Sequence, residues 1–365
     1  MNDQPARRAA LVLSGGVALG AYHAGAYAAL HDGSGLPLEW LAGSSTGAAI
    51  AAIIAGSPPE RRVSQLKRFW QFSANNPSPL ASLLGTPAAG PPRQIYNLAS
   101  VMQAHLFGRP GMFRPRFFPS VGNPGLYELS PLKEWLQELV DFDLLNDGPV
   151  RVTIAATDIV SGERVVFDTG KGCRIGVEHI LASCALTPLF TPVELDGRLL
   201  GDGGLSSNTP LDLVLEEPGD GEQVCFVVEL FARQGSRPHS LSAALARSLD
   251  LVFGNQTQGL LQGQQATYRL RADIQRLAAM LPPERRQDPE VVHLLADSRM
   301  RPTVVLLIGQ RAAPDEAGGG KMFDYSEVTL NERWERGAVH MRTALQTLAE
   351  VSAAAFPPGL SVHEL

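Results

Sequence analysis

The string Gly-Ser-Ser-Thr-Gly at residues 43–47 constrains the fold of this chain more than any other segment. A short, mostly apolar run precedes it, and an unbroken run of Ala and Ile follows at residues 48–55. The pattern Gly-X-Ser-X-Gly between a strand and a helix is typical of a sharp turn that exposes the serine hydroxyl. Gly43 and Gly47 allow the tight turn and close packing of the helix on the strand. The pattern therefore predicts a strand–turn–helix unit with Ser45 as a candidate nucleophile.

Two further motifs are rich in glycine. Residues 14–20 form a loop between a predicted strand and a predicted helix, where backbone N–H groups can bind an anion. This loop matches neither a P-loop nor a dinucleotide fingerprint. Asp202 precedes Gly203 and Gly204 in what reads as a tight turn. Taken singly, the loop fits a structural turn as well as an anion hole, and Asp-Gly-Gly is most often a surface turn.

The order of the predicted elements indicates an α/β protein, because strands and helices alternate in the first third of the chain. The predicted strands lie at residues 9–13, 38–42, 191–195, 222–231 and 303–308, and a hairpin pairs 150–157 with 164–167. The predicted helices lie at residues 21–30, 48–55, 59–72, 95–107, 130–140, 177–185, 241–281 and 327–355. Gly254, Gly259 and Gly263 are potential breaks in the long helix, and residues 318–320 are predicted to form a flexible turn.

Composition narrows the possible functions. Of the 365 residues, 44% are hydrophobic and 19% are charged, as in ordinary globular proteins, and the net charge of −6 argues against a nucleic-acid partner. Cys173, Cys184 and Cys225 lack paired spacing, which predicts buried thiols in a reducing, cytoplasmic compartment and no metal site. The apolar run at 9–13 is too short for a signal peptide. The uncharged stretch 40–59 holds too many small polar residues and prolines for a membrane span.

Taken together, the motifs resemble those of the patatin-like phospholipases, a family of serine lipid acyl hydrolases. The resemblance rests on residues 13–25, on the pentad at 43–47, on 182–193 and on Asp-Gly-Gly at 202–204, and it covers about residues 9–212. The remainder is similar to the helical C-terminal extension of a bacterial subset. The resemblance implies a three-layer α/β/α sandwich with a mostly parallel central sheet.

The resemblance also implies a domain organisation and a chemistry. Residues 1–235 would form the catalytic domain, with a loop-rich, lid-like insert at about 73–126, and 236–365 a mainly helical region that adds the strand at 303–308. Ser45 would be the nucleophile and Asp202 its base, a dyad that requires the carboxylate to be held against the hydroxyl and shielded from water. The implied oxyanion hole uses backbone N–H groups of Gly15, Gly16 and Val17. The implied supporting residues are Gly43, Thr46, Gly47, Gly203 and Gly204.

The loop at residues 14–20 departs from the family pattern, which commonly reads Gly-Gly-Gly-X-Arg-Gly. Val17 replaces the third glycine and Leu19 replaces the basic residue. Because a β-branched side chain restricts its own backbone, Val17 predicts a stiffer loop. The absent arginine removes a charge that could anchor the loop or attract an anionic substrate, so the head-group preference stays open.

The sequence therefore predicts an enzyme that cleaves carboxylic esters of acyl lipids or phospholipids through an acyl-Ser45 intermediate, without a metal or organic cofactor. An acyltransferase or thioesterase would use the same intermediate and differ only in the acceptor. A non-catalytic lipid-binding scaffold is the third alternative, which the presence of both Ser45 and Asp202 disfavours. The oligomeric state stays open.

Other polar residues have simpler interpretations. His23 could complete a triad with Ser45, but a packing hydrogen bond from its helix is the favoured reading. Ser-X-X-Lys at 64–67 lacks its companion motifs and is interpreted as chance. Asp158 and Asp168, beside the predicted hairpin, are interpreted as turn or surface carboxylates.

One charge pattern suggests a membrane partner. Residues 61–127 contain eight Lys or Arg and no Asp or Glu. Aromatic residues alternate there with Arg109, Arg114 and Arg116, a combination suited to the head-group boundary of an anionic bilayer. We interpret this span as a lid or a docking face on an anionic membrane. The alternative places the aromatic residues in the core and the arginines in solvent.

Overall fold

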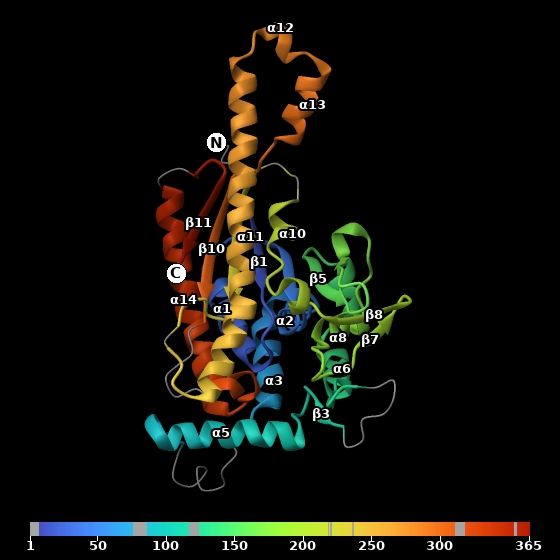
Figure 1. Cartoon of the computed structure of the whole chain (residues 1–365), viewed down its shortest axis with the longest axis vertical. Coiled ribbons are helices and arrows are strands. Elements are labelled where there is room, and N and C mark those ends of the chain that lie inside the picture. The colour runs from blue at the N-terminus through green and yellow to red at the C-terminus, as the bar shows by residue number, and fades with distance from the viewer. Residues whose placement is uncertain are drawn as a thin grey trace.

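A computed structural model describes residues 7–75, 86–116, 124–217, 219, 221–235, 237–310, 318–353 and 356–365. One large sheet forms the centre of the molecule (Figure 1). Its strands follow the order β11 (Leu360–Glu364), β10 (Thr303–Gly309), β9 (Glu222–Glu229), β1 (Arg7–Leu13), β2 (Leu38–Ser44), β5 (Arg151–Asp158), β8 (Arg198–Asp202) and β7 (Val193–Leu195), with β6 (Arg164–Asp168) also paired to β5. The strands from β11 to β5 are parallel, whereas β6 and β8 pair antiparallel with β5 and β7 pairs antiparallel with β8.

The connecting segments are mainly helical. The α-helices are α1 (Ala21–Gly33), α2 (Thr46–Ala55), α3 (Arg62–Ser73), α5 (Gly90–Phe107), α6 (Ser130–Leu139), α7 (Phe142–Asp147), α8 (Val177–Cys184), α9 (Gly204–Ser207), α10 (Asp212–Leu215), α11 (Leu241–Met280), α12 (Pro283–Arg286), α13 (Pro289–Asp297) and α14 (Glu327–Ala353). Short 3₁₀ helices are η1 (Val17–Gly20), η2 (Pro59–Arg61), η3 (Thr169–Lys171) and η4 (Gly318–Phe323). A small separate sheet pairs β3 (Arg114–Pro115) with β4 (Tyr127–Glu128).

Alternate residues of the central strands face two apolar cores, as the two-residue period of a strand requires. On one face, Leu11 and Leu13 of β1 belong to a large core that includes α1, α2, α3 and α14. On the other face, Ala10 and Val12 pack with residues of α10 and with Leu261 of α11. Helices therefore cover both faces of a mostly parallel sheet, and the predicted three-layer α/β/α fold is confirmed.

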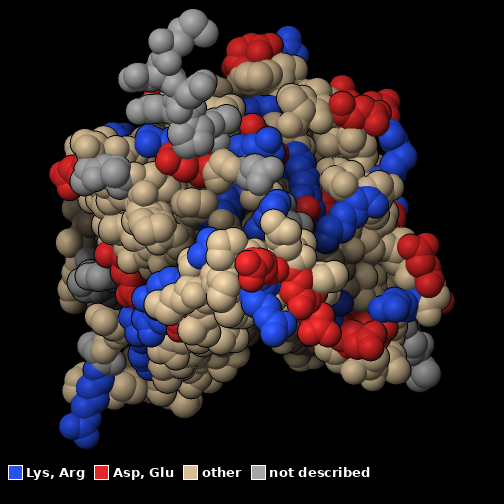
Figure 2. All heavy atoms as spheres, turned by 90° about the horizontal axis from the view of Figure 1, so that it is seen from above, with Lys and Arg blue, Asp and Glu red and all other residues tan. Residues whose placement is uncertain are grey.

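The long axis of the molecule separates two different ends (Figure 1). Helix α11 crosses one face of the sheet and continues beyond it, with α12 and α13 at its far end, whereas α5 lies across the opposite end. Seen from the α12 end, the surface carries many intermixed acidic and basic side chains (Figure 2). No helix within the described ranges combines the length and the apolar composition that crossing a membrane requires.

Three local expectations differ from the structure. Helix α11 continues from Leu241 to Met280 without a break. Gly254 instead allows a close approach, because a Cβ there would press against the carbonyl oxygen of Phe231. Residues 318–320 belong to the 3₁₀ helix η4 instead of a flexible turn. Strands β8 and β11, which pair with β5 and β10, were not foreseen.

Helices α1 and α14 pack with their backbones in contact, although they lie at opposite ends of the sequence. A Cβ on Gly25 of α1 would overlap the carbonyl group of Trp334, and a Cβ on Gly337 of α14 would overlap that of Tyr22. The Tyr22 hydroxyl is hydrogen-bonded to His340 Nδ1 at 2.6 Å across the same contact. The C-terminal helix is therefore part of the core around β1.

Replacing Gly25 with alanine is expected to lower the free energy of unfolding by about 3 kcal/mol or more, because neither backbone can yield without displacing a whole helix. Gly259→Ala is the matched control, since a Cβ there meets no atom within 4 Å and alanine favours a helix by up to about 1 kcal/mol. Chemical denaturation of both variants measures the effect. Equal stabilities would contradict the close α1–α14 packing.

Candidate active site

The pairing of β5 brings two chain segments together at the centre of the sheet. Residues 153–155 of β5 pair with β2 along one edge and with β6 along the other. Residues 156–157 still pair with β6, but their other partner is β8. Strands β2 and β8 therefore occupy the same edge of β5, one after the other. Ser44, the last residue of β2, is opposite Ala155, and Asp202, the last residue of β8, is opposite Ala156. The turns that follow both strands meet at this point.

Ser45 occupies the sharp turn between β2 and α2 that the pentad predicts. Its backbone has φ 55° and ψ −125°, a conformation that L-residues rarely adopt. The Ser45 hydroxyl donates a hydrogen bond to Asp202 Oδ2 at 2.6 Å. The Ser45 N–H donates to the hydroxyl of Ser183 at 2.8 Å, which in turn donates to the carbonyl oxygen of Ala155 at 2.6 Å. Ser183 thus ties the strained turn to β5.

Asp202 is buried at the end of β8, with 4% of its surface exposed. Its second carboxylate oxygen, Oδ1, accepts the N–H of Gly204 at 2.7 Å. Burial raises the pKa of Asp202 to about 6, against the opposing effect of the hydrogen bonds from Ser45 and Gly204. A carboxylate with this pKa is a stronger base than an exposed aspartate and is still largely ionised at pH 7.

The glycines of both motifs permit close backbone contacts. A Cβ on Gly43 would overlap Gly47, and a Cβ on Gly47 would overlap the carbonyl group of Leu13. A Cβ on Gly203 would overlap the carbonyl group of Ala155. Gly204 is similarly enclosed by the side-chain oxygens of Asp202 and Asn208. Larger residues at these positions would push the two turns apart.

The loop at residues 14–20 faces the same point. The N–H of Gly15 donates to Asn208 Oδ1 at 3.1 Å, so Asn208 holds the start of the loop. Within the described ranges, the N–H groups of Gly16 and Val17 make no hydrogen bond to another residue. Val17 has φ 52°, which is costly for a β-branched side chain. Thr46 Oγ1 donates to the carbonyl oxygen of Val17 at 3.2 Å, which links the loop to the serine turn.

A buried arginine anchors this loop from a distant part of the chain. Arg333 of α14 donates through Nη1 to the carbonyl oxygens of Ala18 and Asp324, both at 3.1 Å. Its Nη2 donates to the carbonyl oxygen of Lys321 at 2.9 Å. Leu19, at the position of the absent family arginine, is buried in the core. Arg333 therefore supplies a cation that holds the loop, and sequence reasoning missed it because α14 is remote in the chain.

An apolar cavity of about 40 Å³ adjoins Ser45. Large side chains enclose it: Phe69, Trp70, Met112, Phe113, Phe190 and Tyr325. Typical ligand pockets measure about 300–1,000 Å³, so an acyl chain can enter only if these walls move. Cys184 also lines the cavity, but burial and the Asp202 carboxylate raise its pKa well above the ordinary value. The thiol therefore stays protonated and is a poor nucleophile.

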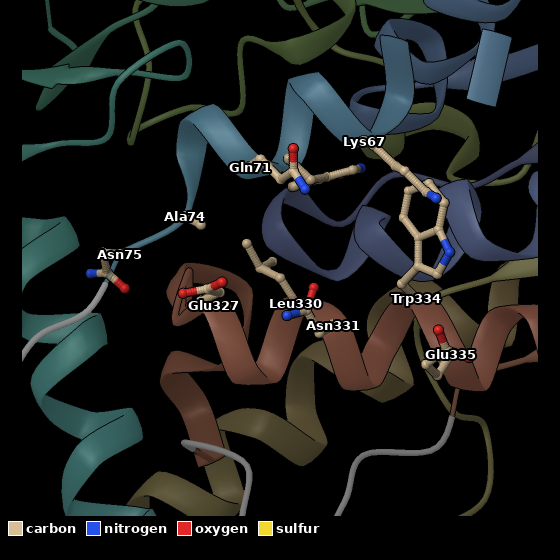
Figure 3. Close-up of a pocket in the computed structure, with 10 residues that line it drawn as sticks. Lys67, Gln71, Ala74, Asn75, Glu327, Leu330, Asn331, Trp334 and Glu335 are labelled. Atoms are coloured by element: carbon tan, nitrogen blue, oxygen red, sulfur yellow. The ribbon is translucent and has the colours of Figure 1, made fainter. Parts of the chain in front are cut away.

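A second hollow between α3 and α14 has a different chemistry (Figure 3). Lys67, Gln71, Asn331 and Glu335 line it, so its character is polar. Trp70 lines both this groove and the apolar cavity and therefore separates them. Of these two pockets, the apolar cavity is the one that Ser45 lines.

The remaining candidates lie elsewhere. His23 is fully buried and donates through Nε2 to the carbonyl oxygen of Val228 at 3.3 Å, and burial lowers its pKa to about 3. Asp158 accepts the N–H groups of Val160 and Ser161 in a turn. Asp168 likewise accepts a backbone N–H in a turn, that of Gly170 at 2.9 Å. Both are therefore turn carboxylates, but both are buried, and Asp168 also forms an ion pair with Arg151 at 2.6 Å.

The three arginines expected at an anionic membrane do not form an exposed cationic face. Arg109 is buried and donates to the carbonyl oxygens of Ser73 and Ala74, both at 3.2 Å, which the end of α3 leaves without helical partners. Arg114 and Arg116 both form ion pairs with Glu128. Of the aromatic residues in the same span, Phe113 is buried in the core and Phe107 is exposed. Phe117 and Phe118 lie outside the described residues.

Comparison with known proteins gives matches to families, to sequences and to structures. A family model described as patatin-like phospholipase matches residues 11–215, and a model described as patatin phospholipase matches 251–353. Uncharacterized NTE family proteins of Mycobacterium bovis and Mycobacterium tuberculosis are 30% identical over 93 residues, which is 26% of this chain and 25% of each relative. The match thus spans about a quarter of the length of these relatives.

Two solved structures show a distant similarity. VipD from Legionella pneumophila is 14% identical with a TM-score of 0.42, covering 94% of this chain and 67% of that one. The ExoU–SpcU complex of Pseudomonas aeruginosa is 17% identical with a TM-score of 0.34, covering 94% and 52%.

Proposed function

The chain belongs to the patatin-like phospholipase family, and from this membership we propose that it is a serine lipid acyl hydrolase with a Ser45–Asp202 dyad. The observation that carries the proposal is the 2.6 Å hydrogen bond from the Ser45 hydroxyl to a buried carboxylate of raised pKa. A serine hydroxyl is a weak nucleophile until a positioned base accepts its proton. Asp202 is the base that contacts it.

In the proposed first half-reaction, Ser45 Oγ attacks the carbonyl carbon of an acyl ester while Asp202 Oδ2 accepts its proton. The N–H groups of Gly16 and Val17 are the proposed donors to the developing oxyanion, since the Gly15 N–H already serves Asn208. Collapse of the tetrahedral intermediate breaks the ester C–O bond, and Asp202 returns the proton to the leaving alcohol. Removing one oxyanion donor typically lowers kcat by about 10²–10³-fold.

In the proposed second half-reaction, Asp202 accepts a proton from water, whose oxygen attacks the acyl-serine carbonyl. The second tetrahedral intermediate releases the carboxylic acid, and the proton returns to Ser45. The apolar cavity beside Ser45 is the proposed site of the acyl chain, because its walls carry few polar atoms. Deacylation by water, and not by another alcohol or a thiol, would distinguish a hydrolase from an acyltransferase.

Fluorophosphonate labelling of the folded protein, followed by peptide mapping, tests the proposal. We expect covalent modification on Ser45 and release of free fatty acid from phospholipid or lysophospholipid. A folded protein that neither reacts with the probe nor releases fatty acid would contradict the hydrolase and favour a lipid-binding scaffold.

Ser183 is a proposed positioning residue for the nucleophile. Replacing it with alanine removes the acceptor of the Ser45 N–H and the donor to Ala155, and is expected to lower kcat by about 10–100-fold with KM little changed. Ser57→Ala is the matched control, because its hydroxyl is also buried but has no hydrogen-bond partner among the described residues. If Ser183→Ala kept the parent kcat, the hydroxyl would be structural only.

A further inference from the structure

Helix α5 exposes an apolar stripe, whereas its buried side mixes polar and apolar residues. Its exposed side is apolar: the exposed fractions are 70% for Ile95, 53% for Leu98, 56% for Met102, 59% for Leu106 and 74% for Phe107. These positions follow the spacing of one helical face. No acidic residue occurs anywhere in this helix. A surface helix normally turns such a stripe toward the core.

Three polar residues of α5, Arg93, Asn97 and Ser100, are buried against the protein. Buried Arg93 donates to Asn97 of the same helix and to Thr329 and Glu332 of α14, each at 3.0 Å. Farther along the helix, Ser100 donates to Asn75 Oδ1 at 2.8 Å. These hydrogen bonds fix the rotation of the helix, so the apolar stripe cannot turn inward without leaving buried polar groups unpaired.

The stripe continues toward the apolar cavity beside Ser45. Phe107 ends α5, and Gly108, with φ 71°, reverses the chain into the segment that holds Met112 and Phe113. Both residues are walls of the cavity. Arg109 fixes the segment to the end of α3. The exposed apolar side chains and the cavity walls therefore belong to one short stretch of chain.

We propose that the apolar stripe of α5 docks the protein onto the surface of a phospholipid bilayer, an inference that rests on the proposed lipid hydrolase function. Eighteen residues at 1.5 Å each give α5 a length of about 27 Å, and the helix lies across one end of the molecule (Figure 1). It can therefore lie flat in the interface, as amphipathic interfacial helices do.

Two features select a bilayer as the occupant. A bilayer is the source of the acyl chain that the cavity walls would receive, so one surface serves both docking and substrate entry. The charged α12 end would then point toward water (Figure 2). Docking here depends on apolar insertion and not on basic residues, because Arg109 is buried and Arg114 and Arg116 are paired with Glu128. Phosphatidylcholine vesicles should accordingly bind the protein without anionic lipid.

Flotation with phosphatidylcholine vesicles tests the proposal, with the Ser45→Ala protein as parent so that lipid is not consumed. The test variant combines Leu98→Gln, Met102→Gln and Leu106→Gln. The control variant combines Leu270→Gln, Leu277→Gln and Met280→Gln on α11, which changes the same residue types at exposed fractions of 62%, 65% and 79%. Phe107→Gln is a milder second variant, for use if the triple variant does not fold.

We expect the α5 variant to partition into vesicles about 10–100-fold more weakly than the parent, because three half-exposed apolar side chains no longer enter lipid. The control variant should partition like the parent. With Ser45 restored, the α5 variant should hydrolyse a soluble short-chain ester at the rate of the unsubstituted protein and lose activity on vesicle phospholipid by a similar factor. Phe107→Gln should weaken partitioning by several-fold.

Undiminished vesicle binding by the α5 variants, or equal loss in the control, would overturn the proposal. The proposal would also be overturned if light scattering showed a dimer of the parent and a monomer of the α5 variant while neither bound vesicles. The stripe would then join two copies of the chain. A different result separates the two proposals. If the Ser45→Ala parent binds vesicles through α5 but the protein with Ser45 intact hydrolyses no ester, docking stands and the hydrolase function fails.

Discussion

Replacing Ser45 with alanine is expected to lower kcat/KM for ester hydrolysis by about 10⁴–10⁶-fold and to abolish fluorophosphonate labelling. The reason is that the acyl intermediate has no other site in the cavity. The one thiol that lines it, Cys184, stays protonated because its pKa is raised well above the ordinary value. Stability should change little, since among the described residues the removed hydroxyl donates only to the Asp202 carboxylate and the backbone turn into α2 is retained. Steady-state kinetics and probe labelling of the purified variant measure the effect.

Ser44→Ala is the control for this result. Ser44 is the last residue of β2 and directly precedes Ser45. It is buried and has a hydroxyl without a hydrogen-bond partner among the described residues. Its loss should leave kcat/KM within a few-fold of the parent value. If Ser45→Ala retained activity while Ser44→Ala lost it, the assignment of the nucleophile would be wrong.

Replacing Asp202 with asparagine is expected to lower kcat by about 10³–10⁴-fold, because an amide can contact the Ser45 hydroxyl but cannot accept its proton. In the parent, kcat/KM should rise with pH and reach half its plateau near pH 6, the value to which burial raises the pKa of Asp202. The residual activity of Asp202→Asn should not show this rise of kcat/KM near pH 6. A pH profile of kcat/KM for both proteins is the measurement, and an unchanged rise near pH 6 in the variant would exclude Asp202 as the base.

The same substitution should affect stability in the opposite direction. The pKa of Asp202 is raised from 3.8 to about 6 on folding, so the folded state holds more protons than the unfolded state between these values. Stability contributed by this group therefore falls as pH rises from about 4 to 6. Asp202→Asn removes the buried charge and is expected to be up to about 3 kcal/mol more stable than the parent at pH 7.5, but not at pH 4. Denaturation at both pH values checks this sign.

Local sequence patterns were sufficient to predict much of the fold and of the candidate site. Ser45 and Asp202 both lie in turns whose neighbouring glycines are visible in the sequence, because close backbone approach excludes larger residues within a few positions. The buried strands were readable for a similar reason, since continuous apolar runs such as 224–228 are typical of a parallel sheet. What no local pattern could give is the register that places β2 and β8 on the same edge of β5.

The residues that the sequence did not reveal act across long separations. Asn208 and Arg333 hold the two ends of the loop at 14–20, and the second of these comes from a helix more than 300 residues away from its partner Ala18. Composition alone also misplaced Arg109, because a buried arginine that binds backbone carbonyls has the same sequence signature as an exposed one. The exposed apolar stripe of α5 was hidden for a related reason. Its buried polar residues have partners such as Asn75 and Glu332, which only the folded chain brings near.

The contact between α1 and α14 has a consequence for how the protein is made. Tyr22 and His340, which meet across it, are 318 positions apart. At about 5–20 residues per second, a ribosome needs about 15–60 s to synthesise the segment between them. Throughout that interval the small-residue face of α1 lacks α14, the helix that covers it in the folded protein. We therefore expect the nascent chain to depend on chaperones that shield apolar surface, with cooperative folding delayed until α14 has emerged.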